Sequence, residues 1–197
     1  METKSGIKTF YAKDRKSWRS WLQKNVEAEK SVWLIIYKKD TSRKSISYLE
    51  AVEEGLCFGW IDSKANKRDE DSFYQFFCKR NPVSKWSKIN KERVSKLIDQ
   101  GLMTTKGMEV IELAKKNGGW TSLDKIENLE LPLDLKNALK KHSKAATNFE
   151  AFPRSVKKGI LEWIQSARTP ETREKRIINT VSLAEKNIRA NQYTPKK

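Results

Sequence analysis

The stretch of sequence that decides the fold is residues 47–90, which read SYLEAVEEGLCFGWIDSKANKRDEDSFYQFFCKRNPVSKWSKIN. It opens with a serine followed three residues later by Glu50, the capping-box pattern that begins a helix, and Gly59 is well placed to end that helix. Residues 60–67 and 72–79 then alternate polar and apolar side chains around a charged turn, which predicts a β-hairpin. Aromatic and polar residues are denser here than a plain core requires, so we expect a functional site within this stretch.

The sequence before this stretch predicts a helix and a central strand. Asp14 can cap a helix that continues to about Asn25. Residues 32–37, VWLIIY, form a continuous β-branched and aromatic run, which is typical of a buried strand. We expect this strand to pair with the hairpin in a small antiparallel sheet. The helix would bury an apolar stripe made of Trp18, Trp21 and Leu22.

From residue 87 onward the apolar residues recur with a helical period. Capping and starting residues predict successive helices that begin near Ser87, Thr104, Pro132, Ser143, Ser155 and Thr169. The expected fold class is therefore α+β, with a small antiparallel sheet and packed helices followed by an all-helical C-terminal half. We expect an α+β domain at residues 1–118, which holds the CFGWID motif, and a helical subdomain at residues 132–190. The weakest connection between them is expected at residues 118–132.

The composition describes a basic chain with enough apolar residues for a core. Of the 197 residues, 37% are hydrophobic and 34% are charged, and 41 Lys and Arg against 25 Asp and Glu give a formal net charge of +16. A field of this sign attracts phosphate-rich or other anionic partners, although lysine-rich surfaces also serve solubility alone. No apolar run approaches the roughly 18 residues of a membrane span, and residues 1–11 lack the apolar core of a secretory signal. We therefore expect a cytoplasmic protein without a membrane span.

The supply of metal-ligating and nucleophilic residues is small. Cys57 and Cys78 form no Cys-x-x-Cys pair, and a structural zinc site needs four nitrogen or sulfur ligands, so we expect no metal. A reducing compartment makes a disulfide unfavourable, and Cys57 is expected to act as a small buried apolar residue. His142 is the only histidine, and its polar Lys-Lys-His-Ser setting fits a solvated residue better than a catalytic base. We expect no organic cofactor.

Several blocks of the sequence resemble the YdeI/OmpD-associated, or bacteriocin-protection, family. They are YxEAVEExLCFGWIDS at residues 48–63, RxxxSxWSxxN at residues 80–90, LIxxGxMTxxG at residues 97–107, and FxxS, ILxWI and PETR within residues 152–173. The resemblance covers roughly residues 10–188. It implies a link to resistance towards bacteriocins or cationic peptides and an outer-membrane porin as partner, but it implies no catalytic residues.

Two details limit what the resemblance implies. The position before Arg80 is usually proline in the family and is Lys79 here, which leaves the orientation of Arg80 less constrained. Direct contact with a porin would require export, and without an expected signal we do not expect porin association.

The main functional hypothesis is a small-ligand or anion site where the hairpin meets the next helix. Helix N-termini attract anions, and tryptophan side chains can wall a pocket. Trp86 is flanked by serine and lysine on both sides, so we expect it to be partly exposed. The predicted site residues are Trp60, Arg80, Ser84, Trp86, Ser87 and Asn90. Capping of the helix by Ser84 or Ser87 explains these serines equally well and can coexist with a site.

An alternative is sequence-independent binding of nucleic acid or another polyanion along residues 79–96. Seven basic residues and one acid, Glu92, occur there, and basic residues interleaved with a tryptophan suit phosphate contact plus base stacking. The residues that would carry it are Lys79, Arg80, Lys85, Trp86, Lys88 and Lys91. No helix-turn-helix, RNP or zinc-finger pattern supports it, and a solvated basic face is the more economical explanation.

A third hypothesis is a metal-independent enzyme that uses Glu54 or Asp62 as a general base. Glu50, Glu53 and Glu54 share one helix face, and Asp62 could join them, as carboxylate pairs do in acid–base catalysis. Glu50 is also explained as the partner of a helix cap, and Glu53 as a solvent-facing residue. Whether the protein is an enzyme therefore stays open at this point.

Overall fold

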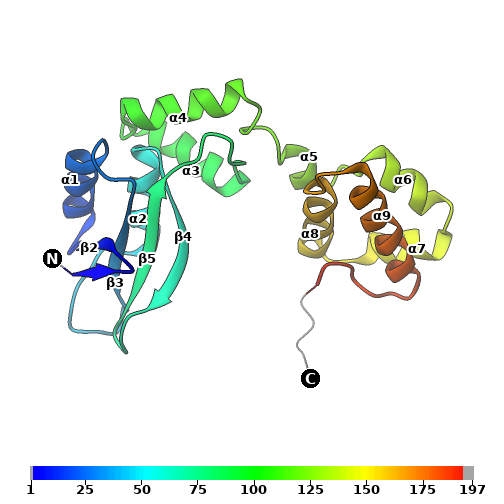
Figure 1. Ribbon diagram of the computed structural model, residues 1–197, viewed down its shortest axis with the longest axis horizontal. Helices are drawn as coiled ribbons and strands as arrows, with labels where there is room; N and C mark the ends of the chain where they lie inside the picture. Colours follow the sequence, from blue (N-terminus) through cyan, green and yellow to red (C-terminus); the bar gives the residue numbers. More distant parts are fainter. Residues whose placement is uncertain (1, 193–197) are drawn as a thin grey trace. The chain divides into compact units, whose positions relative to one another are not determined.

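The computed structural model describes residues 2–192, which form two compact units that divide between Ser122 and Leu123. The first unit combines a sheet with helices and the second is helical, so the expected α+β class is confirmed (Figure 1). The boundary lies inside residues 118–132, where the sequence predicts the weakest connection. That residues 1–118 and 132–190 are separate domains stays a prediction.

The first unit contains a five-stranded sheet in the order β1-β2-β3-β5-β4. The predicted hairpin and its antiparallel pairing with the central strand are confirmed, because β3 and β4 both run antiparallel to β5. The sheet as a whole is mixed rather than antiparallel, because β2 pairs with β3 in parallel. Strand β2 has only five residues, too few for a clear alternation in the sequence. The strands are β1 (Thr3–Lys4), β2 (Ile7–Tyr11), β3 (Ser31–Tyr37), β4 (Trp60–Lys67) and β5 (Ser72–Lys79).

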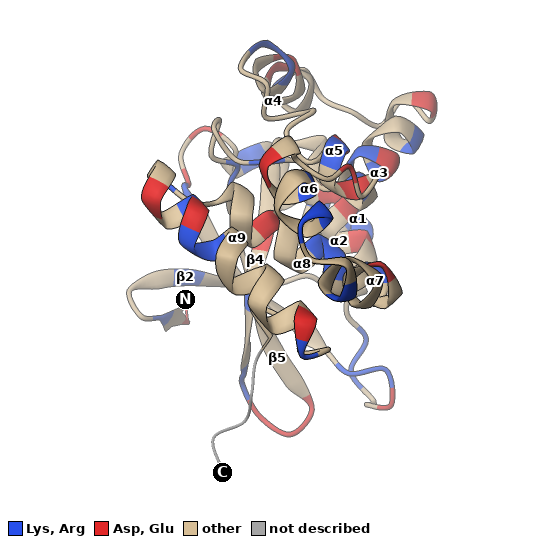
Figure 2. Ribbon diagram, turned by 90° about the vertical axis from the view of Figure 1, so that its right-hand side faces the viewer, with Lys and Arg blue, Asp and Glu red and all other residues tan. Residues whose placement is uncertain are grey.

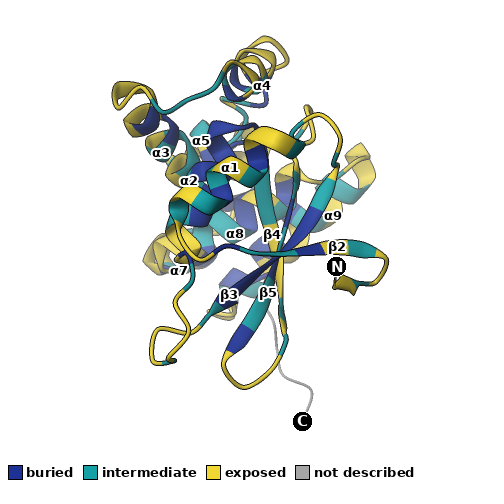
Figure 3. Cartoon of the chain, turned by 90° about the vertical axis from the view of Figure 1, so that its left-hand side faces the viewer, coloured by how far each residue is buried: buried dark blue, intermediate teal, exposed yellow. Residues whose placement is uncertain are grey.

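Four helices pack with this sheet, and their caps follow the sequence. Asp14 caps α1, and Ser47 with Glu50 forms the capping box of α2, as predicted. Strand β3 is buried at five of its seven residues, which explains its continuous apolar run (Figure 3). The helices are α1 (Arg15–Asn25), α2 (Tyr48–Cys57), α3 (Lys88–Asp99) and α4 (Thr105–Lys116). The buried core that they share with the sheet includes Trp18, Leu34, Leu56, Phe77 and Ile111.

Two glycines allow the end of α2 to approach α4 closely. Gly59 follows α2 with a φ of +72°, and a Cβ at this position would lie 2.8 Å from Val110 Cγ2. Gly107 lies in α4, and a Cβ there would lie 2.2 Å from the carbonyl oxygen of Cys57. The same carbonyl accepts hydrogen bonds from the N–H and the hydroxyl of Thr104, at 3.1 and 2.6 Å. These contacts fix the point at which the chain leaves α2 and enters β4.

The second unit is built from helices around its own apolar core. Thr169 caps the last helix, with Pro170 at its first position, as predicted. Pro132 is the N-cap residue of α6 rather than part of its first turn. Within residues 2–192, no helix is long and apolar enough to cross a membrane. The helices are α5 (Asp124–Glu127), α6 (Leu133–Lys140), α7 (Ser143–Ala151), α8 (Arg154–Gln165) and α9 (Pro170–Glu185). Core residues include Leu135, Leu139, Phe149, Ile160 and Ile164.

Candidate functional site

Arg80 is the centre of the predicted site, and it lies directly after β5. Its backbone N–H donates to the carbonyl of Gly59 at 2.9 Å, which ties the end of β5 to the start of β4. Its guanidinium carbon lies 3.8 Å from the ring centroid of Trp86, and Nη2 donates to the carbonyl of Lys85 at 2.6 Å. The Arg80 side chain therefore holds the loop of residues 81–86 against the end of the sheet.

The charge of Arg80 is poorly compensated. The residue is only 7% exposed, and no carboxylate among the described residues forms an ion pair with it. Its Nε is buried and has no acceptor. Burial lowers the pKa of Arg80 to about 10, so the group is still a cation at neutral pH. A buried cation with one donor unpaired is an unusual arrangement, because buried charges are normally paired.

The two predicted tryptophan walls are buried rather than open. Trp86 is 2% exposed, against the expectation of partial exposure. Arg80 covers it at 3.8 Å, and the ring centroid of Trp120 lies 4.9 Å away at an interplanar angle of 49°. Trp60 is fully buried in the main core, edge-on to Trp21 at 5.9 Å, and its Nε1 has no acceptor. The polar neighbours of Trp86 in the sequence do not predict its burial, because Trp120, more than thirty positions downstream, packs on its ring.

The polar residues of the predicted site are used in local hydrogen bonds. Ser87 caps α3 by accepting from the N–H of Asn90 at 3.4 Å, so capping is confirmed for this serine. The hydroxyl of Ser84 instead donates to the carbonyl of Asn81 at 2.7 Å. Asn90 Oδ1 accepts from Arg93 at 3.0 Å. The first turn of α3 contains no acidic residue, so its positive dipole end is not balanced by a carboxylate of its own.

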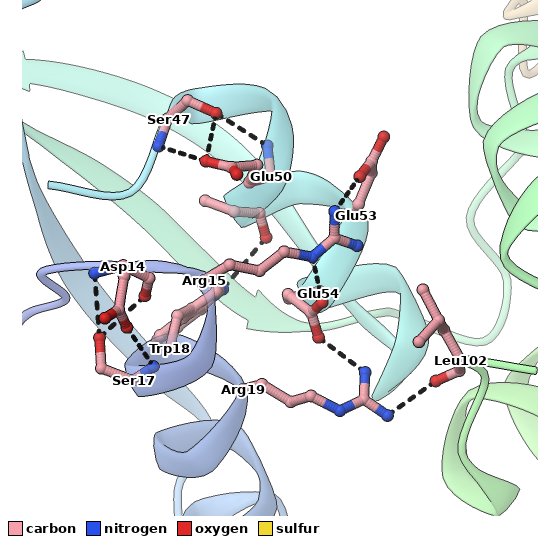
Figure 4. Close-up of polar contacts among 11 residues, drawn as sticks. Asp14, Arg15, Ser17, Trp18, Arg19, Ser47, Glu50, Glu53, Glu54 and Leu102 are labelled. Carbon is pink, nitrogen blue, oxygen red and sulfur yellow. Dashed lines mark hydrogen bonds and ion pairs between the residues drawn. The ribbon is translucent and has the colours of Figure 1, made fainter. Parts of the chain in front are cut away.

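Glu54, one candidate base, is held by two arginines of α1. It is 1% exposed, its Oε1 accepts from Arg15 Nε at 2.6 Å, and its Oε2 accepts from Arg19 Nη1 at 2.8 Å (Figure 4). Burial works against the charge of Arg15, but the hydrogen bond to Glu54 raises its pKa overall. Glu53 accepts from the same arginine at 2.9 Å. Both oxygens of Glu54 are thus already occupied by cations, which is the arrangement of a structural ion pair.

Asp62, the other candidate base, has a different partner. The Tyr48 hydroxyl donates to Asp62 Oδ2 at 2.7 Å. Burial, followed by this bond to Asp62, raises the pKa of Tyr48 to about 12. Glu54 and Asp62 share no partner in these bonds.

The basic residues are not concentrated on one element. Lys79, Lys85, Lys88 and Lys96 are exposed, as the alternative of polyanion binding along residues 79–96 requires. However, lysine and arginine positions are spread over many elements of the chain (Figure 2). The ring of Trp86 is buried, so the structure does not show the exposed ring that base stacking requires.

The reactive and metal-ligating residues remain scattered. Among residues 2–192, no group of three or more His, Cys, Asp and Glu side chains is placed to hold a metal ion. Cys57 is buried, as predicted, and burial raises the pKa of its thiol to about 11. His142 is half-exposed and its Nδ1 lies 2.6 Å from Glu185 Oε1.

Four residues of the site region receive no role from the sequence patterns, although Tyr48 lies in the block of residues 48–63. They are the two arginines that hold Glu54, the tyrosine that holds Asp62 and the tryptophan that covers Trp86, namely Arg15, Arg19, Tyr48 and Trp120. The spacing of the two arginines by four residues places them on one face of α1, and this is a signal that could have suggested a shared carboxylate partner.

Two family models match parts of the chain. Residues 128–187 match the family described as bacteriocin-protection, YdeI or OmpD-associated, which confirms the expected family for this region. Residues 10–110, more than half of the chain, match the family described as a domain of unknown function, DUF8412. No curated protein and no solved structure matches the chain significantly. The chain therefore belongs to the DUF8412 family through residues 10–110 and carries the YdeI/OmpD-associated region at residues 128–187.

Proposed function

We propose that this protein binds a small anion, such as a phosphate or carboxylate group, at the junction of β5 and α3. The observation that carries the proposal is the state of Arg80, a 93% buried cation that has no carboxylate partner and an Nε without an acceptor. An unpaired buried donor costs about 1–3 kcal/mol, and more when the group is charged. A bound oxyanion would remove this cost by supplying both the acceptor and the opposite charge.

The surroundings of Arg80 support an anion over a neutral ligand. Helix α3 has twelve residues and begins at Lys88, eight residues after Arg80, with Ser87 as its cap and no acidic residue in its first turn. The Ser84 hydroxyl, on the connecting loop, donates to the Asn81 carbonyl, and Lys88 at the start of the helix is exposed and lies 3.8 Å from Glu92. Among the described residues, the one buried donor without an acceptor at this junction is therefore Arg80 Nε.

The link to bacteriocin or cationic-peptide resistance is a further part of the proposal. It comes from the description of the family that residues 128–187 match, and no contact of the site argues for it. The alternatives gain less support. Of the two candidate bases, Glu54 is occupied by two arginines and Asp62 accepts from the Tyr48 hydroxyl, and Trp86 is covered.

Thermal unfolding in increasing phosphate, sulfate or citrate at constant ionic strength tests the proposal. We expect one of these anions to raise the melting temperature of the wild type, because a ligand that binds only the folded state stabilises it. The increase should disappear in Arg80→Met and persist in Arg189→Met, which removes the same charge from an exposed position of the second unit. An equal increase in both variants would show that the anion acts through general charge alone and would reject the site.

A further inference from the structure

A second basic feature lies away from Arg80, in a cleft where α1 and α2 both begin. The cleft has a volume of about 380 Å³, and its walls come from the starts of the two helices and from the loop of residues 38–45 that follows β3. Six cationic side chains line it, namely Lys13, Arg15, Lys38, Lys39, Arg43 and Lys44. None of these residues belongs to the site proposed above.

The residues that line the cleft carry an excess of positive charge over their own carboxylates. Its two acidic residues, Asp14 and Glu50, are both engaged in helix caps, with Asp14 accepting from the Ser17 N–H at 2.7 Å and Glu50 from the Ser47 N–H at 3.0 Å. Arg15 forms ion pairs with Glu53 and Glu54, neither of which lines the cleft. The five other cations therefore exceed the two carboxylates by three charges.

Both helices add to this positive potential. Helix α1 has eleven residues and α2 has ten, and the N-terminal turns of both line the same cleft. The positive ends of helix dipoles favour anions, and here two of them meet the cation cluster.

The loop that supplies four of the cations is anchored to the sheet rather than free in solvent. The Arg43 guanidinium carbon lies 4.8 Å from the ring centroid of Tyr11 and 5.0 Å from that of Tyr37, and Arg43 also donates to the Tyr37 hydroxyl at 2.9 Å. The Tyr11 hydroxyl donates to the carbonyl of Lys44, and the Tyr37 N–H donates to Ser45 Oγ at 2.8 Å. A loop held in this way loses less entropy when a ligand binds.

We propose that this cleft binds a small polyphosphate, a ligand with three or more negative charges carried on linked phosphate groups. A single phosphate carries about 1.5–2 charges near neutral pH, which is less than the excess present. Nucleic acid would be contacted by cations that follow its backbone, whereas these cationic residues line one cavity. The proposal is independent of Arg80, since no residue is shared between the two sites.

Calorimetric titration of the full chain with inorganic tripolyphosphate at two salt concentrations tests the proposal, with orthophosphate and a single-stranded oligonucleotide as comparison ligands. The informative variant is Lys39→Ser/Lys44→Ser, because both lysines are exposed and neither has an ion-pair partner among the described residues. We expect at least about tenfold weaker tripolyphosphate binding in this variant, since charge-assisted hydrogen bonds are the strong ones in such a site.

The matched control is Lys24→Ser/Lys116→Ser, which removes two exposed lysines that do not line the cleft. It should bind tripolyphosphate as the wild type does, and so should Arg80→Met, which separates this proposal from the previous one. The cleft proposal is overturned if the wild type does not bind tripolyphosphate, if both lysine pairs weaken binding equally, or if the oligonucleotide binds more tightly per charge than tripolyphosphate.

Discussion

Arg15 in α1 and Glu54 in α2 lie 39 residues apart in the sequence, and Arg15 Nε donates to Glu54 Oε1 at 2.6 Å. Arg19, one helical turn further along α1, donates to the second oxygen at 2.8 Å and to the carbonyl of Leu102 at 2.8 Å. The buried Glu54 therefore fastens α1 to α2, and Arg19 continues the link to the loop before α4 (Figure 4).

Replacing Glu54 should destabilise the first unit markedly. Glu54→Gln removes the charge partner of Arg19 and one of the two carboxylates paired with Arg15, and hydrogen bonds to charged groups contribute about 1.5–3 kcal/mol each. Because both arginines are about one-third exposed, water can partly replace the lost partner, and we expect a total loss near the value of one such bond. Urea unfolding measures it. Glu53→Gln is the control, since Glu53 is one-third exposed and such a surface pair is worth about 0–1 kcal/mol. Equal losses in the two variants would mean that Glu54 does not fasten the helices.

Gly107 should tolerate no side chain. In Gly107→Ala the new Cβ would meet the backbone carbonyl of Cys57, which cannot move aside as a flexible side chain could, so we expect a loss of about 1–3 kcal/mol or more. Gly159 in α8 is the matched control, because nothing lies within 4 Å of a Cβ at that position. There alanine should stabilise its helix by about 0.5–1 kcal/mol. Thermal unfolding of both variants measures the two changes in stability. If Gly107→Ala were as stable as the wild type, α2 would not pack closely on α4.

The two serines before α3 should differ in their contribution to stability. Ser87→Ala removes the side-chain cap of α3 and should cost about 0.5–2 kcal/mol. Ser84→Ala removes only a hydroxyl bond to the Asn81 carbonyl on an exposed loop and should cost less. Hydrogen exchange of the first turn of α3 locates the effect. If the first turn of α3 exchanged faster in Ser84→Ala than in Ser87→Ala, Ser84 rather than Ser87 would be the cap of this helix.

Acid should weaken the second unit partly through Asp134. Arg173 donates to this carboxylate with Nε at 2.6 Å and Nη2 at 3.1 Å, and these bonds hold the pKa of Asp134 below its ordinary value. A carboxylate whose pKa is lower in the folded state stabilises the fold above its unfolded pKa of about 3.9, and this contribution is lost as the pH falls through the folded pKa.

We therefore expect hydrogen exchange in α6 and α9 to accelerate as the pH falls below about 4, after correction for the intrinsic rate. Asp134→Asn should be less stable at neutral pH and should show a smaller acid response. Glu162→Gln, at an exposed position of α8, is the control and should retain the acid response of the wild type. If hydrogen exchange in Asp134→Asn accelerated at acid pH as much as in the wild type, protonation of Asp134 would not contribute to the loss of stability.

The sequence by itself determined the local elements of this protein. The Ser-x-x-Glu box, the glycine after α2, the alternation of β4 and β5 and the helical periods of the second half each depend on residues within a few positions of one another. Such signals do not need the rest of the chain, so they can be recognised in one dimension. The resemblance to the YdeI/OmpD-associated family was expected over residues 10–188. The family model confirms it at residues 128–187, whereas the blocks of residues 48–107 lie in the range that matches DUF8412.

Only the tertiary structure decided which side chains meet and which are covered. The exposure of Trp86 depends on Trp120, the availability of Glu54 depends on Arg15 and Arg19, and the cation cluster of the cleft depends on the return of the chain from β3 to the start of α2. These contacts join residues between 34 and 39 positions apart, or helix ends that meet only after folding. A periodic pattern predicts the face of a helix or strand on which a residue lies. Its burial and its ion-pair partners, however, depend on side chains that come from distant segments of the chain.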